Sequence, residues 1–132
     1  MRSLFVLGAV ALVCGSALAL EAKTLPSGVK VLLTAPGTGA TPKATDTVRV
    51  HYRGTLADGK EFDSSYKRGA PASFPLNRVV PCWTEGFQHI PVGAKATLTC
   101  PPASAYGQQG AGGVVPPNAT LTFEVELLGI ER

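Results

Sequence analysis

Three segments of this 132-residue chain alternate between apolar and polar side chains, and only one other segment has the spacing of an amphipathic helix. The alternating segments are 48–53, 95–100 and 121–127. A period of two places one face of a strand in the core and the other face in water. A short apolar run at 29–33 predicts a further strand, and Asp58-Gly59 predicts a tight hairpin turn after the first alternating segment.

The predicted helix begins at Pro81, because proline suits the first helical turn, where its missing N–H would be unpaired anyway. Trp83, Phe87 and Ile90 follow at the spacing of one apolar stripe, and Pro91 ends the segment. A helix of about two turns is unstable alone and must be held by packing. The predicted fold class is therefore α+β, an antiparallel sheet of about five strands wrapped around one short helix.

Glycine and proline predict irregular structure at 36–46 and 68–74, and 76–80 is predicted to be a short extended piece. The segment 101–117 is rich in Gly, Pro and Ala, which is the composition of a flexible linker. Three larger side chains lie within it: Tyr106, Val114 and Val115. They favour an ordered, functional loop at this position.

Residues 1–19 have the features of a secretory signal peptide. A basic Met1-Arg2 start precedes an apolar run from Leu4 to Val13, and Ala17-Leu18-Ala19 is a small-x-small cleavage site. The apolar run is too short to cross about 30 Å of hydrocarbon as a membrane anchor. We therefore expect cleavage near Leu20, export, and no stable membrane insertion afterwards.

Export would place the mature protein in the periplasm of a Gram-negative cell, with secretion as the alternative. A lipoprotein carrying its lipid on Cys14 is a lesser alternative, because Val13 is bulkier than lipoprotein processing usually accepts. The remaining cysteines are Cys82 and Cys100. In an oxidising compartment an even count favours a disulfide, and two reduced core thiols are the other interpretation. Without a C-x-x-C motif, any bridge would be structural.

Several functional classes are disfavoured by charge and spacing. Lys and Arg number 12, or 11 without Arg2, against 9 Asp and Glu, and the basic residues are scattered singly. This distribution argues against a nucleic-acid partner. Neither His51 nor His89 has a second histidine at metal-ligand spacing, and no serine lies in a G-x-S-x-G motif. We expect no metal site, no nucleophilic catalysis and no cofactor.

An aromatic and aliphatic set remains, and composition alone would place its members in the core: Tyr52, Phe62, Val79, Val80, Trp83, Tyr106 and Phe123. Their sequence context resembles the FKBP-type peptidyl-prolyl cis–trans isomerases over roughly residues 25–132. The matching segments follow the family's order and nearly its spacing: V-R-V-H-Y-R-G-T-L-A-D-G-K-E-F-D-S-S (48–65), V-V-P-C-W-T-E-G (79–86), A-Y-G (105–107), V-V-P-P-N-A-T-L-T-F (114–123) and E-V-E-L-L (124–128). This resemblance implies an FKBP-type domain at 46–132, preceded by a strand and loop at 20–45.

The resemblance also implies a proline-binding pocket with a largely apolar lining. The implied substrate-binding residues are Tyr52, Phe62, Arg68, Val79, Val80, Trp83, Val114, Val115 and Phe123. Asp63 and Tyr106 are the implied catalytic residues, polar groups at the rim, and Arg68 would hold Asp63 through a charge-assisted bond. Without the resemblance, Asp63 would be interpreted as a turn cap with Ser64 and Ser65, and the two roles are compatible.

The chain departs from the family pattern at three positions. Many members have an aromatic residue at the position of Ala72, so we expect one pocket wall to be thinned. Some members have a large residue at the position of Ala111 in the overhanging loop. Both changes should affect substrate preference and inhibitor affinity more than the reaction itself. Glycine is common at the position of Cys82, and because the family fold packs the helix against the sheet, the resemblance implies a bridge to Cys100.

The implied activity is peptidyl-prolyl cis–trans isomerisation, which assists the folding of exported proteins. The implied ligands are proline-containing unfolded or partly folded polypeptides and macrolides of the rapamycin type, and we expect a monomer. One alternative is a non-catalytic chaperone module that holds proline-containing segments in the same pocket. Another is a secreted structural domain whose aromatic residues form only a core.

Overall fold

The computed structural model describes residues 22–111 and 113–131, so the predicted signal peptide, with Cys14, lies outside the described residues. The strands are β1 (Ala22–Thr24), β2 (Lys30–Ala35), β3 (Thr47–Thr55), β4 (Glu61–Ser64), β5 (Ala72–Pro75), β6 (Lys95–Cys100) and β7 (Leu121–Glu131). The helical elements are α2 (Ser65–Arg68), the 3-10 turn η2 (Leu76–Arg78), α3 (Pro81–Gly86), and the 3-10 turns η3 (Phe87–His89) and η4 (Pro102–Ser104).

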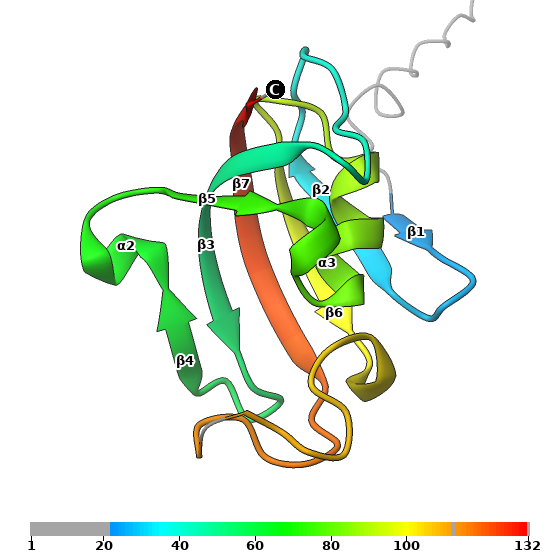
Figure 1. Cartoon of the computed structure of the whole chain (residues 1–132), viewed down its shortest axis with the longest axis vertical. Helices are drawn as coiled ribbons and strands as arrows, with labels where there is room; N and C mark the ends of the chain where they lie inside the picture. Colours follow the sequence, from blue (N-terminus) through cyan, green and yellow to red (C-terminus); the bar gives the residue numbers. More distant parts are fainter. Residues whose placement is uncertain (1–21, 112, 132) are drawn as a thin grey trace, which may run out of the picture.

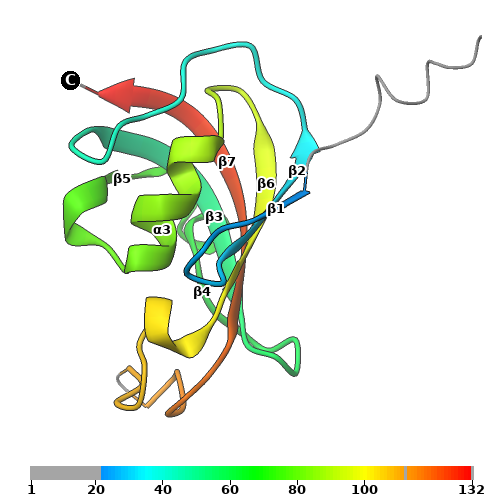
Figure 2. The ribbon, with the colours of Figure 1, turned by 90° about the vertical axis from the view of Figure 1, so that its right-hand side faces the viewer.

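The seven strands form one antiparallel sheet in the spatial order β1-β2-β6-β7-β3-β4. β5 pairs with the N-terminal part of β3, on the edge where β4 pairs with its C-terminal part. The sheet curves around α3, which covers its concave face (Figures 1 and 2). The predicted α+β class is confirmed, but the estimate of about five strands was low because β1 and β5 are too short to show a period.

The alternating segments place their apolar residues on the face that α3 covers. Val48 and Val50 of β3 and Leu98 of β6 are fully buried, as are Leu121 and Leu127 of β7. The predicted hairpin turn at Asp58-Gly59 is present, with a φ of 88° at Gly59 that glycine adopts without strain. The period of two therefore identified three strands of the sheet, β3, β6 and β7.

Residues 68–80 differ from the prediction in two places. The segment expected to be irregular contains β5, which pairs Val50 with Ala72 and Thr47 with Pro75. The pairing with β3 is long-range, so local composition did not reveal it. The segment expected to be extended begins with the 3-10 turn η2, where Leu76 is fully buried and its backbone N–H donates to the carbonyl of Asp46 at 2.9 Å.

The helix α3 begins at Pro81 as predicted, and η3 continues it for three residues. Trp83, Phe87 and Ile90 are all buried, so the apolar stripe faces the sheet. Six residues are too few for a stable isolated helix. Tertiary contacts must therefore hold α3 in place.

A disulfide supplies one of these tertiary contacts. Cys82 in the first turn of α3 is bonded to Cys100 at the end of β6, with the two Cα atoms 5.6 Å apart, a spacing typical of disulfides. Both residues are fully buried. The bridge fixes α3 to the sheet at the residue directly before Trp83.

Removing this disulfide should destabilise the fold. The cysteines are 18 residues apart, and closing a loop of this size contributes about 3 kcal/mol in the chain-entropy model. We expect the Cys82→Ala, Cys100→Ala double variant to lose about that free energy of unfolding in urea titrations. Alkylation of the mature wild-type protein without reductant, followed by mass spectrometry, checks the bond itself. Two alkylated cysteines would show that the bridge does not form.

Candidate functional site

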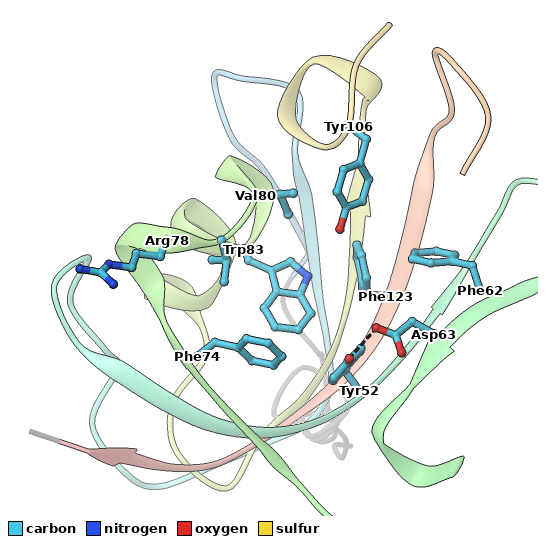
Figure 3. Close-up of a pocket in the computed structure, with 10 residues that line it drawn as sticks. Tyr52, Phe62, Asp63, Phe74, Arg78, Val80, Trp83, Tyr106 and Phe123 are labelled. Atoms are coloured by element: carbon cyan, nitrogen blue, oxygen red, sulfur yellow. Dashed lines mark hydrogen bonds between the residues drawn. The ribbon is translucent and has the colours of Figure 1, made fainter. Parts of the chain in front are cut away.

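A cavity of about 490 Å³ opens between α3, β5, the β3–β4 hairpin and the loop after β6 (Figure 3). Its volume lies in the range of small-molecule sites. The lining residues are Tyr52, Phe62, Asp63, Phe74, Arg78, Val79, Val80, Trp83, Tyr106 and Phe123. The structure thus brings together eight residues that the sequence analysis proposed, and it adds Phe74 and Arg78.

The floor of the cavity is the indole of Trp83, which is 4% exposed. Four rings pack against it in edge-to-face geometry, with centroids 5.1 Å away for Phe74 and Phe87, 5.2 Å for Tyr52 and 5.3 Å for Phe123. This geometry is favoured because the positive edge of one ring meets the negative face of another. The surrounding rings therefore hold the indole in one orientation.

Phe74 forms a wall that the sequence analysis missed. It lies on β5, packs edge-on against Trp83, and has its ring centroid 5.7 Å from that of Tyr52. Ala72 is absent from the cavity lining, and the expectation that its small side chain thins one wall stays a prediction. Alternation along β5 puts residues 72 and 74 on the same face. That alternation was the sequence signal from which Phe74 could have been predicted as a wall residue.

The opposite wall is formed by Phe62 and Phe123, whose ring centroids are 5.6 Å apart. Gly54 of β3 lies beneath both rings. A Cβ atom at this position would be 2.6 Å from Cζ of Phe62 and 2.9 Å from Cε1 of Phe123. The glycine is therefore required for this wall, because any side chain would displace one of the rings.

Asp63 lies at the rim in a closed network with Tyr52 and Arg68. The Tyr52 hydroxyl donates to Oδ2 of Asp63 at 2.6 Å, and Nη1 of Arg68 donates to Oδ1 at 2.7 Å. Nη2 of Arg68 also donates to the Tyr52 hydroxyl oxygen at 2.7 Å. The backbone N–H of Ser64 completes the set by donating to Oδ1 at 2.9 Å.

The helix α2 positions the arginine of this network. Ser64 caps α2 by accepting from the backbone N–H of Lys67, and one helical turn then brings Arg68 back beside Asp63. The capping role considered for Asp63 thus falls on Ser64. The predicted contact between Asp63 and Arg68 is present, whereas the Tyr52 hydroxyl was not identified as a partner.

The network keeps Asp63 ionised. Partial burial opposes ionisation, but hydrogen bonds from Tyr52 and Arg68 and the charge of Arg68 outweigh it and hold the pKa of Asp63 below its usual value. Burial, reinforced by the hydrogen bond to Asp63, raises the pKa of Tyr52. At neutral pH the site therefore contains a carboxylate that only accepts hydrogen bonds and a phenol that keeps its proton.

The lowered pKa of Asp63 predicts a pH-dependent contribution to stability. The contribution is complete above the unfolded-state pKa of about 3.9 and is lost as the pH falls through the lower folded-state value. We expect the stability difference between wild type and Asp63→Asn to be constant at pH 6–7 and to shrink below about pH 4. Urea titrations over this range measure it, with Asp58→Asn in the exposed turn as the control. A difference that stays constant down to pH 2.5 would contradict the network.

Three uncharged hydrogen-bond donors of the cavity lining are unpaired within the described part of the chain. The hydroxyl of Tyr106 points into the cavity beside Phe123 (Figure 3). The backbone N–H of Val80, the residue before α3, makes no hydrogen bond, although its carbonyl accepts from Trp83 and Thr84. The Trp83 indole N–H also has no partner among the described residues. The cavity thus offers donors within an aromatic enclosure.

Val114 and Val115 do not line the cavity. Val115 is 4% exposed and belongs to the core, where it forms an isolated β-bridge with Ala111. Val114 is 53% exposed. The loop contains η4 and this bridge, whereas contact between these valines and a substrate stays a prediction.

Residues 22–111 and 113–131 contain no cluster of three or more His, Cys, Asp or Glu that could hold a metal ion. Within the same residues, no helix is long and apolar enough to cross a membrane.

The fold and the site together define a class of protein. Its members have an antiparallel sheet wrapped on one short helix and an aromatic pocket beside that helix. The model of the FKBP-type peptidyl-prolyl cis-trans isomerase family matches residues 38–128. The chain belongs to this family.

Curated relatives agree with this assignment. The chain is 56% identical over 110 residues to the FKBP-type peptidyl-prolyl cis-trans isomerase FkpA of Aeromonas hydrophila, a match that covers 83% of this chain and 41% of the relative. It is 50% identical to the peptidyl-prolyl cis-trans isomerase Fkbp12 of Drosophila melanogaster, covering 79% of this chain and 99% of the relative. The chain therefore spans about two fifths of the length of the FkpA relative.

A solved structure shows the same fold. The crystal structure of FkpA from Escherichia coli superposes with a TM-score of 0.80 at 48% identity, covering 88% of this chain and 55% of that chain.

Proposed function

We propose that the protein is a peptidyl-prolyl cis–trans isomerase that binds the proline ring of its substrate on the indole of Trp83. The observation that carries the proposal is the cavity itself. A rigid aromatic floor and walls surround unpaired donors, among them the Val80 N–H and the Tyr106 hydroxyl. Membership of the isomerase family supports the same conclusion.

The geometry suits a reaction that breaks no covalent bond. Resonance in the Xaa–Pro amide creates a barrier of about 18–20 kcal/mol, and twisting the bond removes that resonance. The twisted amide is less charge-separated than the planar one, so an apolar pocket stabilises it relative to the planar form. Donors placed for the twisted geometry add differential binding, which is the only kind of binding that accelerates a reaction.

Each polar group then has a defined role. The Val80 N–H is the donor to a substrate carbonyl, and the Tyr106 hydroxyl binds the substrate at the rim. Asp63 is held in place by Arg68 and Tyr52, so its carboxylate presents a fixed negative charge to the twisting amide. It need not take a proton, because isomerisation moves none.

We further propose that the protein assists the folding of exported polypeptides in the periplasm. The signal-like segment 1–19 and the disulfide both suit an oxidising compartment outside the cytoplasm. The substrates are then proline-containing polypeptides that are unfolded or partly folded, and the protein acts as a monomer.

Isomerase activity and its polar residues can be tested together. We expect micromolar wild-type protein to accelerate isomerisation of an Xaa–Pro peptide, and Asp63→Ala with Tyr106→Phe to lower kcat/KM at least tenfold, about 1.4 kcal/mol of transition-state stabilisation. The matched control is Asp58→Ala with Tyr66→Phe, which removes the same groups from exposed positions outside the cavity.

A folded Asp63, Tyr106 variant with full activity would show that the chemistry lies elsewhere. If the wild type binds proline-containing peptides without accelerating isomerisation, the protein is instead a non-catalytic chaperone module. If it neither binds nor isomerises them, the aromatic residues serve only as a core.

Macrolides of the rapamycin type should bind the same cavity, because they present a twisted prolyl amide to it. We expect Ala72→Phe to strengthen binding, since position 72 shares a face of β5 with Phe74 and extends the aromatic wall. Ser73→Phe, which places the same ring on the other face, is the control. Fluorescence titration of Trp83, the single tryptophan of the chain, measures both. Unchanged or weaker binding by Ala72→Phe would contradict this placement.

A further inference from the structure

The cavity lining contains two charged side chains of opposite sign, and only one of them is neutralised. Asp63 is paired with Arg68 at 2.7 Å and also accepts from Tyr52. The side chain of Arg78 makes no hydrogen bond or ion pair with another residue in the part of the chain that the structure describes. Arg78 is therefore the charged side chain of the lining that has no partner of opposite charge among the described residues.

Arg78 lies across the cavity from Asp63. It ends η2 beside the wall formed by Phe74, and its guanidinium group extends outward from the rim, away from Trp83 (Figure 3). The arginine is exposed, so its side chain can contact the part of a bound ligand that extends out of the cavity on this side. A ring held on Trp83 would thus have a fixed carboxylate on one side and a free cation on the other.

The backbone after Arg78 determines which part of a substrate meets this cation. Val79 has an extended conformation with φ −116° and ψ 176°, and it leads directly to Val80, the proposed donor to a substrate carbonyl. Extended backbone rises about 3.3 Å per residue, so two residues separate Arg78 from that donor by about 7 Å. An extended substrate covers the same distance in two residues, so a residue close to the proline can lie near Arg78.

We propose that Arg78 makes this protein select Xaa–Pro segments that carry an aspartate or glutamate side chain next to the proline. The inference rests on the proposed function and adds a substrate class to it. A guanidinium group donates two parallel hydrogen bonds to a carboxylate, a geometry that amides and ammonium groups cannot match. Lysine or arginine next to the proline would be repelled, and this repulsion contributes to the selectivity.

Two peptide series test the proposal, one varied at the residue before proline and one at the residue after it. Each series contains Glu, Gln and Lys, and isomerisation is followed by NMR exchange without a coupling protease. We expect the wild type to favour Glu over Lys in kcat/KM in at least one series, by about two- to fivefold, the range of exposed ion pairs. The preference should weaken at 0.5 M salt because salt screens exposed charges.

Substitutions assign the preference to one side chain. Arg78→Gln should abolish the preference and Arg78→Glu should invert it. Arg49→Glu is the matched control, since Arg49 is exposed on β3, lies outside the cavity lining and changes the net charge equally. It should retain the wild-type preference. A Glu-to-Lys ratio near one in both series, or a ratio unchanged by Arg78→Glu, would overturn the inference.

Failure of the proposed function would give a different result. If no peptide is isomerised, including the neutral Gln peptides, the enzymatic proposal fails. The charge preference is then read from binding of the same peptides to the wild type and the three variants, using Trp83 fluorescence. Equal affinities for Glu and Lys peptides in that titration would refute the role of Arg78.

Discussion

The edge-to-face packing around Trp83 is the interaction on which the site depends. The indole contacts rings from β3, β5 and β7 and the ring of Phe87 beneath it, so the four elements meet at one side chain. The short helix α3 lacks the length to be stable alone, and these contacts together with the disulfide hold it. The same residues therefore stabilise the fold and shape the pocket.

This arrangement suits the isomerase activity that we propose, which requires no proton-transferring group. Asp63 is an ionised carboxylate whose position is set by Tyr52 and Arg68, and none of the three is free to rotate without breaking a hydrogen bond. The cost of orienting these dipoles is met when the protein folds, not when the substrate binds. Preorganised polarity of this kind stabilises a changing charge distribution without reorganisation during the reaction.

The sequence was sufficient for residues whose environment follows a local period. Alternation located β3, β6 and β7, and helical spacing located α3 with Trp83. Phe74 was missed because β5 is four residues long and is defined by its pairing with β3, a long-range contact. Arg78 belongs to no periodic segment. The role that we propose for it follows from the structure, where Asp63 is paired with Arg68 and Arg78 is not paired. The hydroxyl of Tyr52 likewise gains its role from tertiary placement.

The pocket has a rigid floor and an exposed rim, and this difference affects the range of substrates that it can bind. The floor is fixed by rings and by the Cys82–Cys100 bond, whereas Tyr106 and Arg78 lie at an open rim. In the proposed function, the rigid floor binds what all Xaa–Pro segments share, the proline ring and its amide. Exposed rim groups contribute only modest energies, so they bias the choice among substrates without preventing any of them from binding. Broad activity with a weak charge preference would suit the role in assisting folding that we propose.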